Sequence, residues 1–302
     1  MSKFDVIGVG LSAMDYLGIV DEYPPPADVK ICMSEFTKQG GGPVATALVA
    51  LSRLGIKTAF VGKMGDDESG VFMLKSLKDE GVDVSHVVIE KGASSPPAFI
   101  VVDRNSGSRN IFWSESNISP LQPSEISHDF IKSCRILHLD GLQMQAGIEA
   151  AKVAREAGIT VILDGDTIRP GIDEMISLTD VIVASYNFAV NFTGESSLKE
   201  AMIKLNSMGP KTVGVTLGEK GCIFLENGNE ISIPAFPVEI VDTTGAGDVF
   251  HGAFIYGLLQ EWPLDKIAEF SNAVSAIKCR KLGGRAGIPS LNEVKIFLGW
   301  NW

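Results

Sequence analysis

Short runs of β-branched residues alternate with longer stretches of helical periodicity, and this alternation limits the possible folds more than any other feature. The predicted strands are almost continuously apolar, as is typical of strands buried on both faces of a parallel sheet. They span Phe4–Gly8, Thr58–Val61, Ile136–Leu139, Thr160–Leu163, Val181–Ala184 and Val213–Thr216. The predicted helices span Pro43–Leu54, Gly70–Glu80, Ala146–Ala157 and Leu198–Ser207. We therefore predict an α/β fold, a three-layer αβα sandwich with a mostly parallel central sheet.

Two insertions interrupt this alternation. Residues 20–36 contain a run of prolines and an alternating segment at 30–33, whereas Ala98–Asp103 and Arg109–Trp113 are typical of two strands around a turn. Since inserted strands of this kind pair outside the main sheet, we predict a small β-sheet lid from about 14–39 and 96–114. The whole chain, 1–302, is predicted to be a single domain carrying this discontinuous lid.

The carboxyl-terminal third is predicted to change character. A hairpin is expected from Cys222–Leu225 to Ile231–Ile233, with its turn at Asn227-Gly228. After Pro237 we expect a strand, then a glycine-rich turn, and then mainly helix.

Charge and cysteine content limit the possible partners. The chain has 26 Lys and Arg against 37 Asp and Glu, a net charge of −11. Such a surface repels nucleic-acid backbones and anionic lipids, so neither nucleic acid nor a membrane is an expected partner. The four cysteines show no zinc-site spacing, and no segment is typical of a leader or a membrane span. We therefore expect reduced thiols and a cytoplasmic location.

One glycine motif near the start invites an interpretation that the following sequence excludes. Gly8-Val9-Gly10-Leu11-Ser12-Ala13 resembles the G-x-G-x-x-A turn of dinucleotide-binding enzymes. That turn must open a crossover helix, but here the chain leads into Pro24-Pro25-Pro26, which no such helix accommodates. A dinucleotide-binding oxidoreductase is therefore disfavoured.

The segment Val241–Phe254 carries the strongest chemical signal. Its sequence predicts a strand end, the turn Gly245-Ala246-Gly247 and an apolar helix that begins at the turn. The free N–H groups and the dipole of a helix start bind anions. Asp248 lies beside this anion site, and a carboxylate next to a bound anion is electrostatically unfavourable unless it has a task. Accepting a proton from an attacking hydroxyl group is such a task.

A second glycine motif precedes the first long helix. Gly40-Gly41-Gly42-Pro43 forms a predicted hinge between the lid and the main sheet. Together the two motifs resemble, in order and spacing, both signature regions of the ribokinase-like (PfkB) carbohydrate kinases, and the resemblance spans nearly the whole chain. Including Val161–Asp166 and Lys278–Pro289, the motifs are most similar to the bacterial sulfofructose kinase branch.

The resemblance implies an ATP-dependent phosphotransferase that moves the γ-phosphoryl group to an alcohol group of a ketose or related sugar, anionic sugars included. It implies that Asp248 is the base and that the amides of Gly245, Ala246 and Gly247 form the anion hole. It also implies that Asp15, Gly41 and Gly42 bind the sugar; from their place in the lid, Lys30 is a candidate contact for an anionic group and Asn110 a candidate for the pocket.

Nucleotide and metal contacts follow from the same resemblance. Those implied for ATP are Asn187, Thr216, Gly218 and Asn272. Val190 replaces the acidic residue of the family's N-x-x-E motif, so Asp164 and Asp166 are expected near Mg²⁺. Asp242 and Thr244 resemble a site for a monovalent cation such as K⁺. His251, Arg169 and Arg285 are interpreted as structural.

The substrate stays open at this point. The positions that hold a sulfonate in the similar branch fall near Trp113 and near Gly141 or Leu142, so the sulfonate clamp is missing. A nucleoside kinase of the same fold and a non-catalytic nucleotide-binding regulator are the alternatives. Exposed strand edges in the lid favour a homodimer formed through it.

Overall fold

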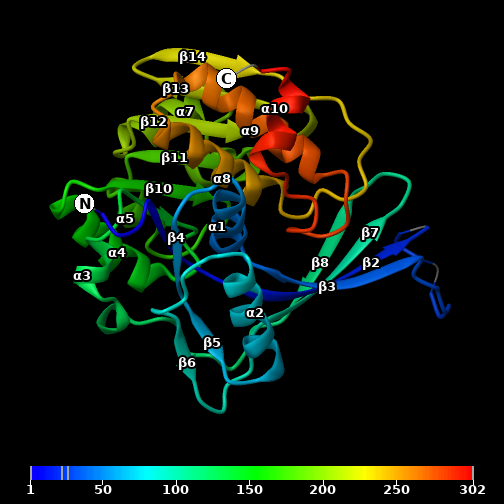
Figure 1. The fold of residues 1–302 in the computed structure, drawn as a ribbon. Coiled ribbons are helices and arrows are strands. Elements are labelled where there is room, and N and C mark those ends of the chain that lie inside the picture. The colour runs from blue at the N-terminus through cyan, green and yellow to red at the C-terminus, as the bar shows by residue number, and fades with distance from the viewer. Residues whose placement is uncertain (1, 22, 26, 301–302) are drawn as a thin grey trace.

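An eight-stranded sheet runs through the middle of the molecule in the computed structural model, which describes residues 2–21, 23–25 and 27–300 (Figure 1). Its strand order is β14-β13-β12-β11-β10-β9-β1-β4, parallel from β12 to β4 and antiparallel at the β13 and β14 edge. The bounds are β1 (Val6–Val9), β4 (Thr58–Val61), β9 (Ile136–Leu139), β10 (Thr160–Gly165), β11 (Val181–Ser185), β12 (Thr212–Thr216), β13 (Cys222–Glu226) and β14 (Asn229–Ile233). The predicted strands and the predicted hairpin are thus confirmed to within two residues at each end.

Helices cover both faces of this sheet, which makes the predicted three layers. One face packs against α1 (Pro43–Arg53), α8 (Ala246–Leu259) and α9 (Leu264–Lys278), with α2 (Glu68–Asp79) and α10 (Leu291–Leu298) outside them. The other face packs against α3 (His128–Ile131), α4 (Met144–Glu156), α5 (Ile172–Ser177), α6 (Tyr186–Thr193) and α7 (Leu198–Ser207). Helix α8 is buried almost all round, because it lies between α1 and α9.

A four-stranded sheet projects from one end of the molecule, and we call it the lid sheet (Figure 1). Its order is β3-β2-β7-β8, with bounds β2 (Ala13–Val20), β3 (Glu35–Gly41), β7 (Pro97–Asp103) and β8 (Arg109–Trp113). These strands come from the two segments predicted for the lid, and the last two match the predicted strands within one residue. A further pair, β5 (Lys63–Gly65) and β6 (Val88–Glu90), forms a small separate sheet.

Two predicted strand segments are wrong. Residues 30–33 are not a strand: Glu35, the first residue of β3, pairs with Ile19, and β2 ends one residue later at Val20. Residues 234–243 carry no strand either. The amides of Val241 and Asp242 both donate to the Cys279 carbonyl oxygen, at 2.9 and 3.1 Å, so the segment lies against the end of α9.

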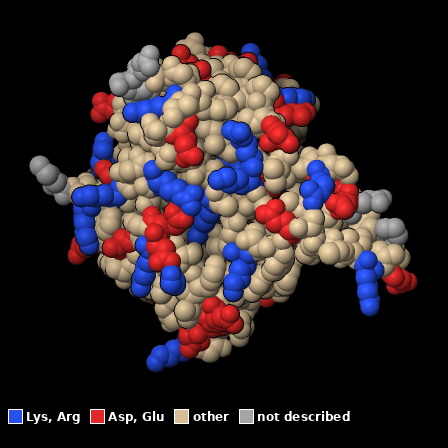
Figure 2. All heavy atoms as spheres, turned by 45° about the vertical axis from the view of Figure 1, so that its right-hand side comes forward, with Lys and Arg blue, Asp and Glu red and all other residues tan. Residues whose placement is uncertain are grey.

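Charges of both signs are interspersed on the face shown in Figure 2, where the tip of the lid sheet projects to the right. Pro26, the last residue of the proline run, lies outside the described residues, as do residues 1, 22, 301 and 302. Within the described part of the chain, no helix has the length and apolar character needed to cross a membrane.

Candidate active site

The predicted site residues gather at the edge of the central sheet where the parallel strands end. Asp164 is the second-last residue of β10, Thr216 ends β12, and Asn187 follows β11 at the start of α6. In open α/β sheets, ligands bind outside these carboxyl ends. The lid sheet brings Asp15 to the same region from β2, and α8 brings Asp248 from its first turn.

Asp248 is the third residue of α8 and lies in a desolvated, charged environment. Burial, followed by the charges of Asp164 and Asp166, raises the pKa of its carboxyl to about 6, while His251 and Arg109 act to lower that pKa. A carboxyl of this kind is ionised at neutral pH and close enough to its pKa to accept a proton, which suits a general base.

His251 lies one turn after Asp248 and forms a buried ion pair with Asp164. The distance from His251 Nε2 to Asp164 Oδ1 is 3.2 Å, and the two side chains are 4% and 9% exposed. The pKa of His251 is raised by Asp164 in spite of its burial, and the pKa of Asp164 is lowered by His251 in spite of its own burial. The stacked ring of His138 has a pKa lowered to about 3 by burial, so it stays neutral. His251 therefore does more than pack.

Asp15 faces the interior on the body side of the lid sheet. Burial raises the pKa of its carboxyl to about 7; the guanidinium of Arg285 acts to lower it, and the charges of Asp248 and Asp242 act to raise it. Asp15 and Asp248 are therefore close enough to influence each other's charge. The structure thus brings together the two carboxylates on which the predicted chemistry depends.

Gly41 lies directly against Asp15. A Cβ atom built at Gly41 would come within 2.1 Å of Asp15 Oδ2. The main-chain carbonyl of Gly41 accepts a 3.0 Å hydrogen bond from Nη2 of the buried Arg285. The next residue, Gly42, has a φ of 94° and is the N-cap of α1, which begins at Pro43. Arg285 is therefore structural, as predicted, and it also places a positive charge next to Asp15.

The turn before Asp248 leaves open space next to Gly247. Gly245 has a φ of 73° and lies against the main chain of Gly284, whereas a Cβ atom built at Gly247 would meet nothing within 4 Å. The protein itself does not fill that space, so a ligand has room to approach the main chain there. The Ala246 amide already donates to the Thr243 carbonyl oxygen at 3.2 Å, which leaves Gly245 and Gly247 as the stronger candidates for an anion hole.

A cavity of about 470 Å³ opens beside this turn. Residues predicted for the nucleotide and the anion hole line it, among them Gly218, Ala246, Gly247 and Asn272. The Asn272 side chain donates from Nδ2 to the carbonyl oxygens of Ile233 and Pro234, at 3.1 and 3.0 Å. Asn272 therefore fixes the segment that forms one wall of the cavity.

Two predicted sugar contacts are not brought to this group. Lys30 is exposed in the loop between β2 and β3. Asn110 pairs with Val101, whereas Ala98, next to Asp15 in the sheet, pairs with Trp113. Because side chains alternate between the two faces of a strand, this register puts Asn110 on the face away from Asp15.

Two residues of the site were missed at the level of sequence. Arg109, the neighbour of Asn110, is on the inner face; its Nη1 donates to Thr243 Oγ1 at 2.8 Å, and it lines the 470 Å³ cavity. Asp140 follows β9, accepts hydrogen bonds from the amides of Leu11 and Leu142, and has its pKa raised to about 7 by burial. Its position directly after a predicted parallel strand was the available signal for Asp140.

The predicted metal positions differ in how well they fit. Asp166 is exposed at the sheet edge, whereas Asp164 is engaged by His251. Among the described residues, no group of three His, Cys, Asp or Glu side chains is placed to hold a metal ion. This donor set fits Mg²⁺ held mainly by nucleotide phosphates and water, with one carboxylate nearby.

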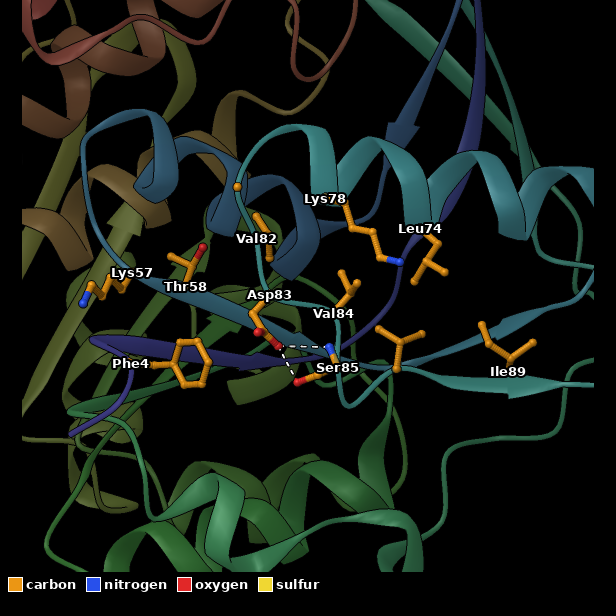
Figure 3. Close-up of a pocket in the computed structure, with 12 residues that line it drawn as sticks. Phe4, Lys57, Thr58, Leu74, Lys78, Val82, Asp83, Val84, Ser85 and Ile89 are labelled. Carbon is orange, nitrogen blue, oxygen red and sulfur yellow. Dashed lines mark hydrogen bonds between the residues drawn. The ribbon is translucent and has the colours of Figure 1, made fainter.

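A second hollow, of about 640 Å³, lies between α2 and the start of β4 (Figure 3). Its lining includes Lys57, Lys78 and Asp83, and the Asp83 carboxylate is occupied by hydrogen bonds from Ser85 (Figure 3). None of the predicted site residues lines it. The larger hollow is therefore not the candidate active site.

Comparison with known proteins gives a family match over most of the chain. The family model for pfkB family carbohydrate kinases matches residues 3–291. A ribokinase from Haemophilus influenzae is 32% identical over 297 residues, covering 90% of this chain and 95% of that protein. A probable fructokinase from Arabidopsis thaliana is 31% identical over 310 residues, covering 94% and 95%.

Solved structures show the same fold. A ribokinase from Thermotoga maritima superimposes with a TM-score of 0.84 at 26% identity, covering 98% of this chain and 99% of that one. An Escherichia coli structure in complex with ATP and Mg²⁺ gives a TM-score of 0.86 at 21% identity, with 98% and 99% covered. The similarity to the sulfofructose kinase branch stays a prediction.

Proposed function

The chain belongs to the pfkB family of carbohydrate kinases, and we propose that it transfers the γ-phosphoryl group of ATP to a hydroxyl group of a ketose or related sugar. The placement of Asp248 carries this proposal. It is a desolvated carboxylate in the first turn of α8, next to a glycine turn with open space and within electrostatic reach of Asp15. A carboxylate that shares a site with phosphate anions repels them, which is unfavourable unless it accepts a proton there.

The proposed step is a direct transfer. The sugar oxygen forms a bond to the γ-phosphorus, and its proton passes to the Asp248 carboxylate. The bond from the γ-phosphorus to the bridging oxygen breaks, and the electron pair leaves with ADP. The main-chain amides of Gly245 and Gly247 are oriented before the reaction, so they stabilise the transferred charge without rearrangement. When bound, Mg²⁺ neutralises phosphate charge, and we propose Asp166 as the carboxylate nearest to it.

The remaining residues position the two substrates. We propose that Asp15 accepts hydrogen bonds from sugar hydroxyl groups, and that Gly41 and Gly42 let the sugar approach the main chain. For ATP, the proposed contacts are Gly218 and Asn272, which line the cavity, together with Asn187 and Thr216 at the strand ends. Arg109 adds a positive charge between the lid sheet and Thr243, where the phosphates of ATP would lie.

A substrate panel tests the function. Ribose, fructose, an anionic sulfonated ketose and adenosine are each incubated with ATP and Mg²⁺, and ADP release is measured. We expect turnover with at least one sugar. Turnover with adenosine alone would establish a nucleoside kinase instead. Nucleotide binding without turnover across the panel would favour a regulator.

The pH dependence of sugar phosphorylation provides a second check. We expect kcat/KM to fall as the pH drops through about 7 and then about 6, because Asp15 and Asp248 must both be ionised and have pKa values raised to about 7 and about 6. Arg109→Met should move the acidic limb to higher pH, since the guanidinium lowers the pKa of Asp248. Arg104→Met, at an exposed ion pair in the same hairpin, should leave the limb in place. A flat profile between pH 5 and 8 would contradict both assignments.

The outer face of the lid sheet exposes apolar side chains that could form an interface with a second copy of the chain. Phe36, Phe99 and Phe112 are 61, 55 and 52% exposed, and the register places them on the face away from Asp15. We propose that two copies pair through this apolar face as a homodimer. Sedimentation should then show a dimer for the native chain and a monomer for Phe112→Glu. Val71→Glu, which changes an apolar residue that is 61% exposed on α2, should remain dimeric. A monomeric native chain would contradict the proposal.

A further inference from the structure

Lys278 is a fully buried lysine at the end of α9. It is 0% exposed and is among the largest side chains that the fold buries completely. Lysine is almost never fully buried unless its charge is paired. The fold must therefore supply partners for this ammonium group.

The partners lie at the start of the turn that leads to Asp248. Lys278 Nζ donates a 2.9 Å hydrogen bond to the main-chain carbonyl of Asp242. Asp242 is also 0% exposed, and its carboxylate accepts hydrogen bonds from the Thr244 amide at 2.8 Å and the Gly283 amide at 2.7 Å. A lysine and an aspartate are therefore both buried at this turn, with the ammonium group on the main-chain carbonyl of the residue that carries the carboxylate.

The same cluster joins the segment that begins at Asp242 to two segments that follow each other closely, at the end of α9 and just after it. Asp242 begins the first segment, and its amide donates to Cys279 in the second. Gly283 belongs to the third segment, as does Gly287. A Cβ atom built at Gly287 would lie 2.2 Å from the Lys278 carbonyl oxygen, so this segment packs closely on the end of α9. The ammonium group thus lies where these segments meet and where the path into α8 is set.

The family resemblance implies a monovalent cation on these same segments, through Asp242 and Thr244. A potassium ion would supply one positive charge to main-chain and carboxylate oxygens. The Lys278 ammonium already supplies one positive charge to that place, with an N–H group on the Asp242 carbonyl oxygen. We propose that Lys278 is a built-in cation that replaces a bound potassium ion in organising the turn before Asp248.

Lys278 is therefore a positioning residue that acts through the main chain of the turn. This inference rests on the proposed function only for its kinetic readout. The native chain should turn over equally well in potassium, ammonium, sodium and choline chloride at one ionic strength. Lys278→Ala should lower kcat at least about tenfold in choline chloride, since small misplacements of reacting groups cost up to about 100-fold.

Two variants separate loss of charge from loss of packing. Lys278→Ala leaves space for an ion, so potassium or ammonium chloride should restore several-fold of its lost kcat. Lys278→Met removes the charge but fills the space, so the same salts should not rescue it. Lys281→Ala, at an exposed neighbouring lysine, should behave like the native chain.

A readout without turnover keeps the test independent of the substrate. The melting temperature of Lys278→Ala should rise in potassium chloride relative to choline chloride, whereas that of the native chain should not. Thallium(I) soaked into crystals of the native chain should give no anomalous peak beside Asp242. A thallium peak there, or specific activation of the native chain by potassium, would overturn the proposal even if Lys278→Ala fails to fold.

Failures of the two proposals are distinguishable. If no sugar is phosphorylated, the proposed kinase function fails, while the melting and thallium measurements still report on Lys278. If a sugar is phosphorylated but a folded Lys278→Ala variant responds alike to all four salts, the built-in cation is wrong and the kinase function stands.

Discussion

We expect Asp248→Asn to lower kcat for sugar phosphorylation at least about 100-fold, the lower limit for loss of a positioned general base. Asparagine has nearly the same shape, so packing at the start of α8 is preserved. Its amide cannot take up the proton that the carboxylate receives, and it also removes a buried negative charge that has an unfavourable interaction with Asp164. The loss should therefore appear in kcat rather than in the melting temperature.

A matched control lies in the first turn of the following helix. Asp265 is the second residue of α9 and is exposed, so Asp265→Asn changes the same chemical group at a helix start outside the site. It should keep kcat within about twofold, as surface changes usually leave the fold intact. Steady-state kinetics at saturating ATP and sugar measures both variants. Near-native turnover by Asp248→Asn would remove Asp248 from the role of base.

His251→Leu should reduce the free energy of unfolding by about 3–5 kcal/mol, the typical result of removing one partner from a buried ion pair. The leucine would leave the Asp164 carboxylate, 9% exposed, without its 3.2 Å partner and still next to Asp248. His251→Gln keeps a hydrogen-bond donor and should recover part of the loss. Urea denaturation followed by circular dichroism measures the change.

An exposed pair of the same type is the control. His128 and Glu149 are 2.8 Å apart, but their side chains are 53 and 31% exposed. His128→Leu should therefore change stability by less than about 1 kcal/mol, as is usual for surface pairs. A similar effect of both leucine variants would mean that burial does not strengthen the His251–Asp164 pair.

The two pKa shifts also set the pH range in which this pair stabilises the fold. The pKa of Asp164 is lowered from 3.8, so its contribution is present above 3.8 and is lost as the pH falls through the folded-state value. The pKa of His251 is raised from 6.5, so its contribution is complete below 6.5 and is lost as the pH rises through the folded-state value. The difference between native chain and His251→Leu should be largest between these two limits.

The elements that are simplest to predict are those with a long and regular pattern. The six central strands and α7 are found within two residues of their predicted ends, because apolar runs and helical periodicity both reflect burial in the core. The three-residue strands β5 and β6 are too short to show any pattern. The prediction of a strand at 30–33 was wrong because alternation of polar and apolar residues does not by itself provide a neighbouring strand to pair with.

The site was predictable only in part, for a geometric reason. Asp248 and Asp15 could be predicted from motifs, because each lies in a short continuous segment whose sequence is itself the signal. Whether Asn110 or Arg109 faces the site depends on the register of β8 against β7, and a shift by one residue reverses the answer. The pairing of His251 with Asp164 depends on the packing of α8 against β10, which no local pattern reports.

The contact between Gly41 and Asp15 restricts how related sequences can diverge. Any side chain at position 41 would collide with the Asp15 carboxylate at 2.1 Å. A lineage that gains a side chain at position 41 must therefore turn the acid at position 15 away or lose it. Either change takes the carboxylate from its present position, so substitutions at the two positions are expected to be coupled.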